Sequence, residues 1–181
     1  MNTAIDSEKI IILDFGSQYT QLIARRIREL GVYSEILSCE TSYENILKAN
    51  PKGIIISGGP ESVNAKNTLK VDPKIIESET PVLGICYGMQ LMSKHFRGSV
   101  NTSMKREFGH AEIKLNKSKL FQGIKLSTLN VWMSHGDKVT KLPKGFKKVA
   151  SSKNSPIAAF ENNSIKKYGL QFHPEVTHTE K

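Results

Sequence analysis

The segment 84–90, Gly-Ile-Cys-Tyr-Gly-Met-Gln, places a cysteine between two glycines at the spacing G-x-C-x-G. An apolar run at 81–83 precedes it and a helical pattern at 90–96 follows, which predicts a strand-to-helix junction. Flanking glycines allow a tight turn that projects Cys86 outward in a strained conformation. The N-terminus of the following helix favours the nucleophilic thiolate. Cys86 is therefore a candidate nucleophile, with a simple packing role as the alternative.

A second motif, Phe-His-Pro-Glu at 172–175, directly follows an apolar stretch that predicts a strand. His173 is far from Cys86 in the sequence, as expected of a base that folding brings to its nucleophile. Glu175 is placed to accept a hydrogen bond from the second imidazole nitrogen and to fix the tautomer of the ring. An isolated His-x-Glu is more often structural. Combined with the cysteine motif, it predicts a Cys-His-Glu triad for acyl transfer.

A third motif, Gly58-Gly59-Pro60, follows the apolar run 53–57. Glycines at the carboxyl end of a strand let the backbone approach a ligand and point N–H groups at developing negative charge. For this motif alone, a simple turn is the competing interpretation. In an open α/β sheet, ligands bind at the carboxyl ends of the strands, so all three motifs are expected to meet at one edge.

The elements that must position these motifs alternate along the first half of the chain. Strands are expected at 10–13, 32–37, 53–57 and 82–85, with helices at 18–30, from 41 or 42 to 48, and from 72 onward. Gly31 is a natural helix stop, and Asp72 and Pro73 are typical of a helix start. This rhythm predicts a mostly parallel central sheet with right-handed crossovers, flanked by helices.

From residue 98 onward the pattern changes to short β-branched or aromatic segments between Gly, Pro, Asn and Lys turns. The candidate strands are 131–133, 147–150, 157–160 and 168–172. They are expected to be mostly antiparallel additions to the sheet. The predicted class is α/β, with residues 1–181 forming a single domain.

Composition excludes several other classes. With 38% hydrophobic and 24% charged residues, the chain of 181 residues suits a globular core. Apolar stretches of about 18 residues are absent and the N-terminus lacks a signal-peptide pattern, which predicts a cytoplasmic protein without a membrane span. Two cysteines, Cys39 and Cys86, without C-x-x-C or H-x-x-x-H spacing, predict neither a disulfide framework nor a metal site.

The chain is basic, with 26 Lys and Arg against 17 Asp and Glu and a net charge of +9. Such a charge is compatible with nucleic-acid binding. The lysines are scattered through apparent turns, however, without interleaved aromatic residues or a known binding module. We therefore expect no nucleic acid, and attribute the charge to surface composition or to an acidic partner.

The motifs, in this order, resemble the class I (triad-type) glutamine amidotransferases, which have a flavodoxin-like architecture. Within that family, three further segments resemble the glutaminase domains of GMP synthetases. They are Asp-Phe-Gly-Ser-Gln-Tyr at 14–19, Trp-Met-Ser-His-Gly-Asp-Lys-Val at 132–139 and His-Pro-Glu-Val-Thr-His-Thr at 173–179. The resemblance covers essentially the whole chain.

The resemblance implies the reaction and the residues that perform it. Cys86 would attack the side-chain amide of L-glutamine, form a γ-glutamyl thioester and release ammonia. His173 would shuttle protons, and Glu175 would orient it. The resemblance further implies that the N–H groups of Gly59 and Tyr87 form an oxyanion hole. It also implies that the amino-acid end of the substrate is bound by Gln90 and the main chain of Ser134, Gly136 and Asp137.

The resemblance also implies a partner. Ammonia would pass to an ATP-pyrophosphatase (synthetase) domain or subunit that uses ATP and Mg²⁺ to convert XMP to GMP. This chain ends at Lys181 and contains no phosphate loop. We therefore expect that domain to be absent here and the chain itself to need no cofactor, whether it is a separate subunit or an excised domain. Its activity is expected to be restrained until the partner holds its own substrates.

Two alternatives remain at this point. One is a cysteine hydrolase or peptidase of related fold that needs no partner, against which the segment 132–139 argues. The other is a non-catalytic regulatory module that has kept the fold. The presence of Cys86, His173 and Glu175 together argues against the module.

Overall fold

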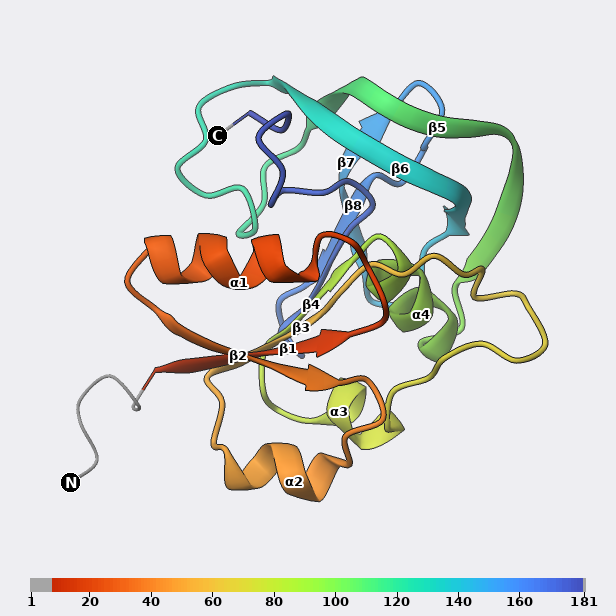
Figure 1. Ribbon diagram of the computed structural model, residues 1–181. Helices are drawn as coiled ribbons and strands as arrows, with labels where there is room; N and C mark the ends of the chain where they lie inside the picture. Colours follow the sequence, from red (N-terminus) through yellow and green to blue (C-terminus); the bar gives the residue numbers. More distant parts are fainter. Residues whose placement is uncertain (1–7, 181) are drawn as a thin grey trace.

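The computed structural model describes residues 8–180, without the side chains of 104 and 105. Five strands are parallel: β1 (Lys9–Asp14), β2 (Tyr33–Ser38), β3 (Gly53–Ile56), β4 (Val82–Ile85) and β9 (Lys167–Leu170). Four more extend the same sheet with antiparallel pairing: β5 (Ser99–Leu115), β6 (Thr128–Lys141), β7 (Lys147–Ser152) and β8 (Ala159–Asn162). The strand order is β2-β1-β3-β4-β9-β8-β7-β5-β6 (Figure 1). The predicted α/β class, with a parallel half and antiparallel additions, is confirmed.

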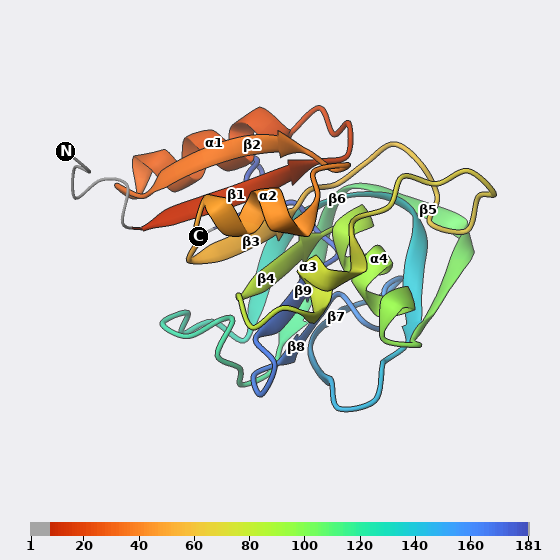
Figure 2. The ribbon, with the colours of Figure 1, turned by 90° about the horizontal axis from the view of Figure 1, so that it is seen from below.

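Helices cover both faces of the parallel half. Helix α1 (Thr20–Glu29) lies on one face, whereas α2 (Tyr43–Lys48) and α3 (Pro73–Glu77) lie on the other (Figure 1). Helix α4 (Tyr87–His95) packs beside α3 (Figure 2). Consecutive residues of β1 are fully buried against opposite layers, which is why this strand is apolar at successive positions.

The predicted helix boundaries have the expected chemistry. The Ser42 hydroxyl accepts a hydrogen bond from the Asn45 N–H at the start of α2. Asp72 caps α3 and Pro73 is its first residue. After α1, Gly31 adopts a φ of +79°, and its N–H donates to the Arg28 carbonyl at 2.9 Å. Local sequence therefore sets these ends.

The second half differs from the prediction of short segments, because β5 and β6 are long strands paired as a two-stranded ribbon. In β6 every second residue from Leu129 to Val139 is buried. Two of these inward positions hold the polar residues His135 and Asp137, which hides the apolar alternation that marks a strand. The expected strand at 157–160 also begins later, as β8.

Candidate active site

The strand order brings the three motifs together. Strands β3, β4 and β9 are neighbours in the sheet, and each is followed by one motif. Leu170, the last residue of β9, pairs with the last residue of β4, and its carbonyl accepts a 2.7 Å hydrogen bond from the Cys86 N–H. Because parallel strands end at the same edge, Gly59, Cys86 and His173 share one site.

The turn around Cys86 has the expected strain. Cys86 has φ 51° and ψ −104°, outside the regions that side chains usually allow, and caps α4, which begins at Tyr87 rather than at Gln90. A Cβ on Gly84 would lie 2.5 Å from the main chain of Gly88, and one on Gly88 would lie 2.3 Å from the Ile56 carbonyl oxygen. Both flanking positions therefore require glycine.

His173 and Glu175 form a buried pair. The Nδ1 atom of His173 lies 2.7 Å from Oε1 of Glu175, and both side chains are at most 4% exposed. Main-chain contacts fix the loop that carries them, since the His173 N–H donates to the Trp132 carbonyl and the Arg26 guanidinium donates to the Glu175 carbonyl. The carboxylate thus sets the orientation of the ring.

The imidazole also faces Cys86. A Cβ placed on Gly58 would lie 3.1 Å from Cε1 of His173 and 3.7 Å from Cβ of Cys86, so both side chains converge there. Burial by itself lowers the pKa of His173, but the interactions with Cys86 and Glu175 outweigh it and raise the pKa to about 9. The ring is therefore protonated at neutral pH and places a positive charge beside the Cys86 side chain.

Two cavities meet at Cys86. The larger, of about 350 Å³, is lined by Cys86, Tyr87, Gly59, Pro60, Glu61, Ser62, Gln90, Thr102, Arg106, Phe108 and residues 134–137. The smaller, of about 230 Å³, is lined by Gly59, Pro60, Cys86, Ser134, His173 and residues 16–19. The larger volume is in the range of small-molecule sites.

The two residues predicted to form an oxyanion hole, Gly59 and Tyr87, both line the larger cavity. Tyr87 is the first residue of α4, so no carbonyl within the helix accepts its N–H. Gly59 borders both cavities, and a Cβ there would lie 2.9 Å from the Phe15 carbonyl oxygen. Glycine at this position therefore lets the backbone pass close to Phe15, and the Tyr87 ring lies 3.5 Å from the same point.

The predicted substrate-binding residues form one wall of the larger cavity. Ser134, Gly136 and Asp137 follow one another along β6, and the Ser134 carbonyl accepts a 3.6 Å hydrogen bond from the Cys86 thiol. The Gln90 side chain donates to the Asp137 carbonyl at 2.8 Å and to the Gln171 side chain at 3.3 Å. Gln90 therefore holds this wall in place, with its amide hydrogens directed at protein groups.

Several site residues were not singled out from the sequence. Gln171 is buried and its amide donates to the Cys86 sulfur at 3.7 Å. Tyr19 packs edge-on against the His173 ring, with 5.0 Å between ring centroids. Ser62 donates to the Asp137 carboxylate, and Arg106 lies over Gly136. The resembling segment 14–19 contains Tyr19, whereas nothing local in the sequence marks the other three.

Comparison with known proteins places this site in a family. The family model described as Glutamine amidotransferase class-I matches residues 11–181. The chain therefore belongs to the class I glutamine amidotransferases, which confirms the resemblance drawn from the motifs. The peptidase and non-catalytic alternatives are not favoured.

Within this family, the chain is similar to proteins named GMP synthase. A GMP synthase [glutamine-hydrolyzing] of Enterococcus faecalis is 55% identical over 174 residues, which are 96% of this chain and 33% of that protein. A protein of the same name from Vibrio vulnificus is 51% identical over 180 residues, 99% of this chain and 35% of that protein. The chain thus spans about a third of the length of the curated relatives that it matches.

Solved structures of related proteins have the same fold as this chain. A Thermoplasma acidophilum protein described as a GMP synthase subunit superposes with a TM-score of 0.83 at 32% identity, covering 96% of this chain and 87% of that one. A Thermotoga maritima glutamine amidotransferase has the same fold, with a TM-score of 0.76 at 24% identity and coverage of 94% and 77%.

Two further observations concern residues 8–180. None of their helices is long and apolar enough to cross a membrane. Within the same range, His, Cys, Asp and Glu side chains form no group of three or more that could hold a metal ion.

Proposed function

We propose that this chain hydrolyses L-glutamine to glutamate and ammonia, and that the ammonia serves the ATP-dependent amination of XMP to GMP. The observation that carries the proposal is the convergence of Cys86 and the buried His173–Glu175 pair at adjacent strand ends, where Cys86 also lines a cavity of small-molecule size. Family membership and the names of the relatives support the choice of glutamine as substrate.

In the first half-reaction, the Cys86 sulfur attacks the side-chain amide carbon of glutamine. The carbonyl oxygen gains negative charge, and the N–H groups of Gly59 and Tyr87 donate hydrogen bonds to it. The carbon–nitrogen bond then breaks as His173 gives a proton to the leaving nitrogen. Ammonia departs and a γ-glutamyl thioester remains on the cysteine.

In the second half-reaction, water attacks the thioester. His173, now without its extra proton, accepts one from the water, and the carbon–sulfur bond breaks. Glutamate leaves, and the cysteine and imidazolium are restored. Glu175 keeps Nδ1 of the ring occupied throughout, so that the other nitrogen faces the reacting atoms.

Recognition of the amino-acid end is assigned to the wall of the larger cavity. The main chain of Ser134, Gly136 and Asp137 would bind the α-amino and α-carboxylate groups, with Gln90 supporting the wall from behind. Arg106, at the rim, adds a positive charge suited to the carboxylate.

The proposal extends to the rest of the system. Residues 1–181 would act as one amidotransferase domain in the cytoplasm, and the ATP-pyrophosphatase part would be another domain or subunit. ATP and Mg²⁺ would be requirements of that part. The support is that the GMP synthases matched here are about three times as long as the region they share with this chain.

The test is mass spectrometry of the chain after treatment with 6-diazo-5-oxo-norleucine, an electrophilic mimic of glutamine. We expect one adduct, on Cys86, that excess glutamine prevents. Cys39 is the internal control, because it is also buried and burial raises its pKa, which makes it unreactive. Cys86→Ala should abolish both labelling and hydrolysis, whereas Cys39→Ala should leave both intact.

Labelling that falls on Cys39, or labelling of Cys86 that glutamine does not reduce, would contradict the proposal. The same measurement with the synthetase part added separates a site that needs its partner to assemble from a wrong assignment. In the first case glutamine-protected labelling of Cys86 appears only in the mixture.

A further inference from the structure

Glu107, His135, Ser152 and Ser155 form a second buried cluster. It adjoins residues 134–137, which form one wall of the 350 Å³ cavity that is called the glutamine cavity below. Nε2 of His135 is 3.2 Å from Oε2 of Glu107, and the same carboxylate accepts hydrogen bonds from Ser155 at 2.8 Å and Ser152 at 3.2 Å. Glu107 is 8% exposed, His135 5% and Ser155 fully buried. Neither half-reaction described above uses these residues.

The cluster stands where the β5–β6 ladder is interrupted. Thr102 pairs with Asp137 and Glu107 pairs with His135, so the residues 103–106 of β5 bulge out opposite the single residue Gly136. The main chain of β6 loses regular strand pairing at this point. Its polar groups need other partners if the wall of the cavity is to keep one conformation.

Side chains supply those partners. The Asp137 carbonyl accepts two hydrogen bonds, from the Gln90 amide at 2.8 Å and from Nδ1 of His135 at 2.9 Å. A carbonyl and a carboxylate both only accept, so the two contacts are hydrogen bonds when the imidazole donates from Nδ1 to the Asp137 carbonyl and from Nε2 to Glu107. The imidazole therefore bridges the carboxylate on one strand and the main chain of the wall on the other.

The carboxylate is suited to this role. Burial by itself raises the pKa of Glu107, but its hydrogen bonds with His135 and Ser155 outweigh burial and hold the pKa below the ordinary value. Glu107 therefore remains charged at neutral pH and is a strong, fixed acceptor for the imidazole.

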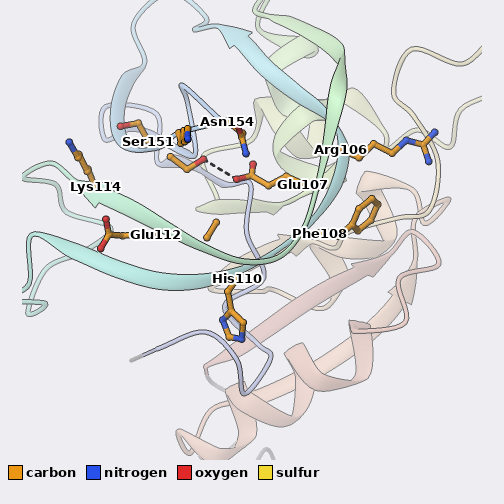
Figure 3. A pocket seen from close by; sticks show the side chains of 11 residues that line it. Arg106, Glu107, Phe108, His110, Glu112, Lys114, Ser151 and Asn154 are labelled. Carbon is orange, nitrogen blue, oxygen red and sulfur yellow. Dashed lines mark hydrogen bonds between the residues drawn. The ribbon is translucent and has the colours of Figure 1, made fainter.

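Glu107 does not border the glutamine cavity. In Figure 3 its side chain points toward the end of β7 and the bend that follows it, residues 151–154, whereas Arg106 and Phe108 point away from this segment. Glu107 lines a different cavity, of about 770 Å³, which lies between β5 and residues 151–154. His135, by contrast, is part of the glutamine wall. Of the side chains that Glu107 contacts, His135, Ser152 and Ser155, His135 is the one that also lines the glutamine cavity, so we expect an influence of Glu107 on glutamine to pass through it.

From these contacts we infer that Glu107 is a positioning residue for glutamine recognition, acting through His135 on the main chain of residues 135–137. The inference rests on the proposed glutaminase function. Because Cys86 follows β4 and His173 follows β9, away from the β5–β6 ribbon in sequence, loss of Glu107 should weaken recognition of the amino-acid end while leaving the reactivity of the cysteine unchanged.

The test compares two reagents for Cys86. Labelling by 6-diazo-5-oxo-norleucine requires the amino-acid wall, whereas alkylation by iodoacetamide requires only a reactive sulfur. Second-order rate constants for both are measured on the wild-type chain, Glu107→Ala, His135→Ala and the double variant. We expect the ratio of the two constants to fall about tenfold in Glu107→Ala, with the iodoacetamide constant unchanged.

The double variant tests whether Glu107 acts on the cavity wall through His135. If Glu107 acts through His135, the double variant should have the same ratio as His135→Ala alone. Independent, multiplying losses would overturn the inference. So would a wild-type ratio in Glu107→Ala, or an equal slowing by both reagents, which is the signature of general structural damage.

Glu161→Ala is the matched control. Glu161 is also a buried carboxylate, 3% exposed, and it accepts hydrogen bonds from the N–H groups of Lys119 and Leu120 instead of contacting the glutamine wall. This control should lose stability with no change in the ratio. If Glu107→Ala does not fold, Glu107→Asp is measured instead, since it keeps the charge but is too short to reach His135, and the same fall in ratio is expected.

Failure of the inference is distinct from failure of the proposed function. The absence of any glutamine-protected adduct on wild-type Cys86, both alone and with the synthetase part added, overturns both. A protected adduct in the wild type, with a ratio insensitive to Glu107, overturns the positioning role alone.

Discussion

At the scale of single residues, the site depends on one buried electrostatic arrangement. His173 is held between the Cys86 sulfur and the Glu175 carboxylate, and these two neighbours raise its pKa against the effect of burial. The second carboxylate oxygen of Glu175, Oε2, is buried without a hydrogen-bond partner among residues 8–180. The imidazole is thus the main contact of the Glu175 carboxylate, and we expect substitution of Glu175 to change the protonation of His173.

Glu175→Gln should therefore lower the pKa of His173 from about 9 toward its ordinary value, because the variant keeps the shape but removes the charge that lies 2.7 Å away. Glutamine hydrolysis should fall by roughly 100-fold or more, since the amide no longer enforces the tautomer. An NMR titration of the His173 ring measures the first effect and glutamate release the second. An unchanged titration would show that Glu175 does not set the charge of the ring.

The same pKa shift has a consequence for stability. A histidine with a raised pKa stabilises the folded state fully below its unfolded pKa, near 6.5, and loses that contribution as the pH rises through about 9. The stability difference between the wild type and Glu175→Gln should accordingly shrink across this window, as measured by urea unfolding at a series of pH values.

At the scale of elements, the junction between β4 and α4 is the most constrained feature. Cys86 takes a positive φ, and the helix begins immediately after it, so that α4 must pack closely on β3 and β4. The close approach requires Gly88, where a Cβ would lie 2.3 Å from the backbone of β3. The strain at the nucleophile is thus maintained by helix-to-sheet contact.

Gly88→Ala should destabilise the fold by about 1–3 kcal/mol, because the methyl group has no space beside a rigid backbone. It should also slow iodoacetamide alkylation of Cys86, since the helix must shift away from the sheet. Gly53→Ala is a suitable control, because its Cβ would meet the flexible end of the Ile10 side chain at 3.0 Å and the Pro81 carbonyl oxygen only at the ordinary contact distance of 3.7 Å. Equal effects of the two substitutions on alkylation would argue against the packing explanation.

At the scale of the whole molecule, the antiparallel half contributes the proposed substrate wall, and the parallel half positions the proposed nucleophile. The β5–β6 ribbon places Ser134 against Cys86, although the two residues belong to strands at distant positions in the sheet order. The Cys86 side chain lies at the floor of two cavities and the residue is only 5% exposed. Access to the sulfur is therefore controlled by the ribbon and by the loops at 16–19 and 59–62.

A protein with this arrangement should respond to a partner that contacts those loops. We expect low glutaminase activity from this chain alone, rising about tenfold when the ATP-pyrophosphatase part is added with ATP and XMP, a coupling of ordinary size. The reason is that hydrolysis without an acceptor for ammonia consumes glutamine to no purpose. Equal, high activity with and without the partner would contradict the coupling, and the partner without nucleotides is the control.

The first strand and several helix ends could be predicted because neighbouring residues in the sequence determine them. Ile10–Leu13 is apolar at every position and forms a strand covered on both faces; Gly31, Ser42 and Asp72 mark helix ends through their own backbone preferences. The length of β5 and β6 could not be predicted, because polar residues occupy inward positions of the ribbon.

The sequence by itself determined the candidate nucleophile, the base, the glycines and the family, since each is carried by residue type and short spacing. Only the tertiary structure decided which strands are neighbours, and hence that Cys86 and His173 meet. It also decided that Glu107 faces His135 across an interrupted ladder and that Gln171 reaches the sulfur. These contacts join residues far apart along the chain, and strand order and register create them, so no local pattern of residues records them.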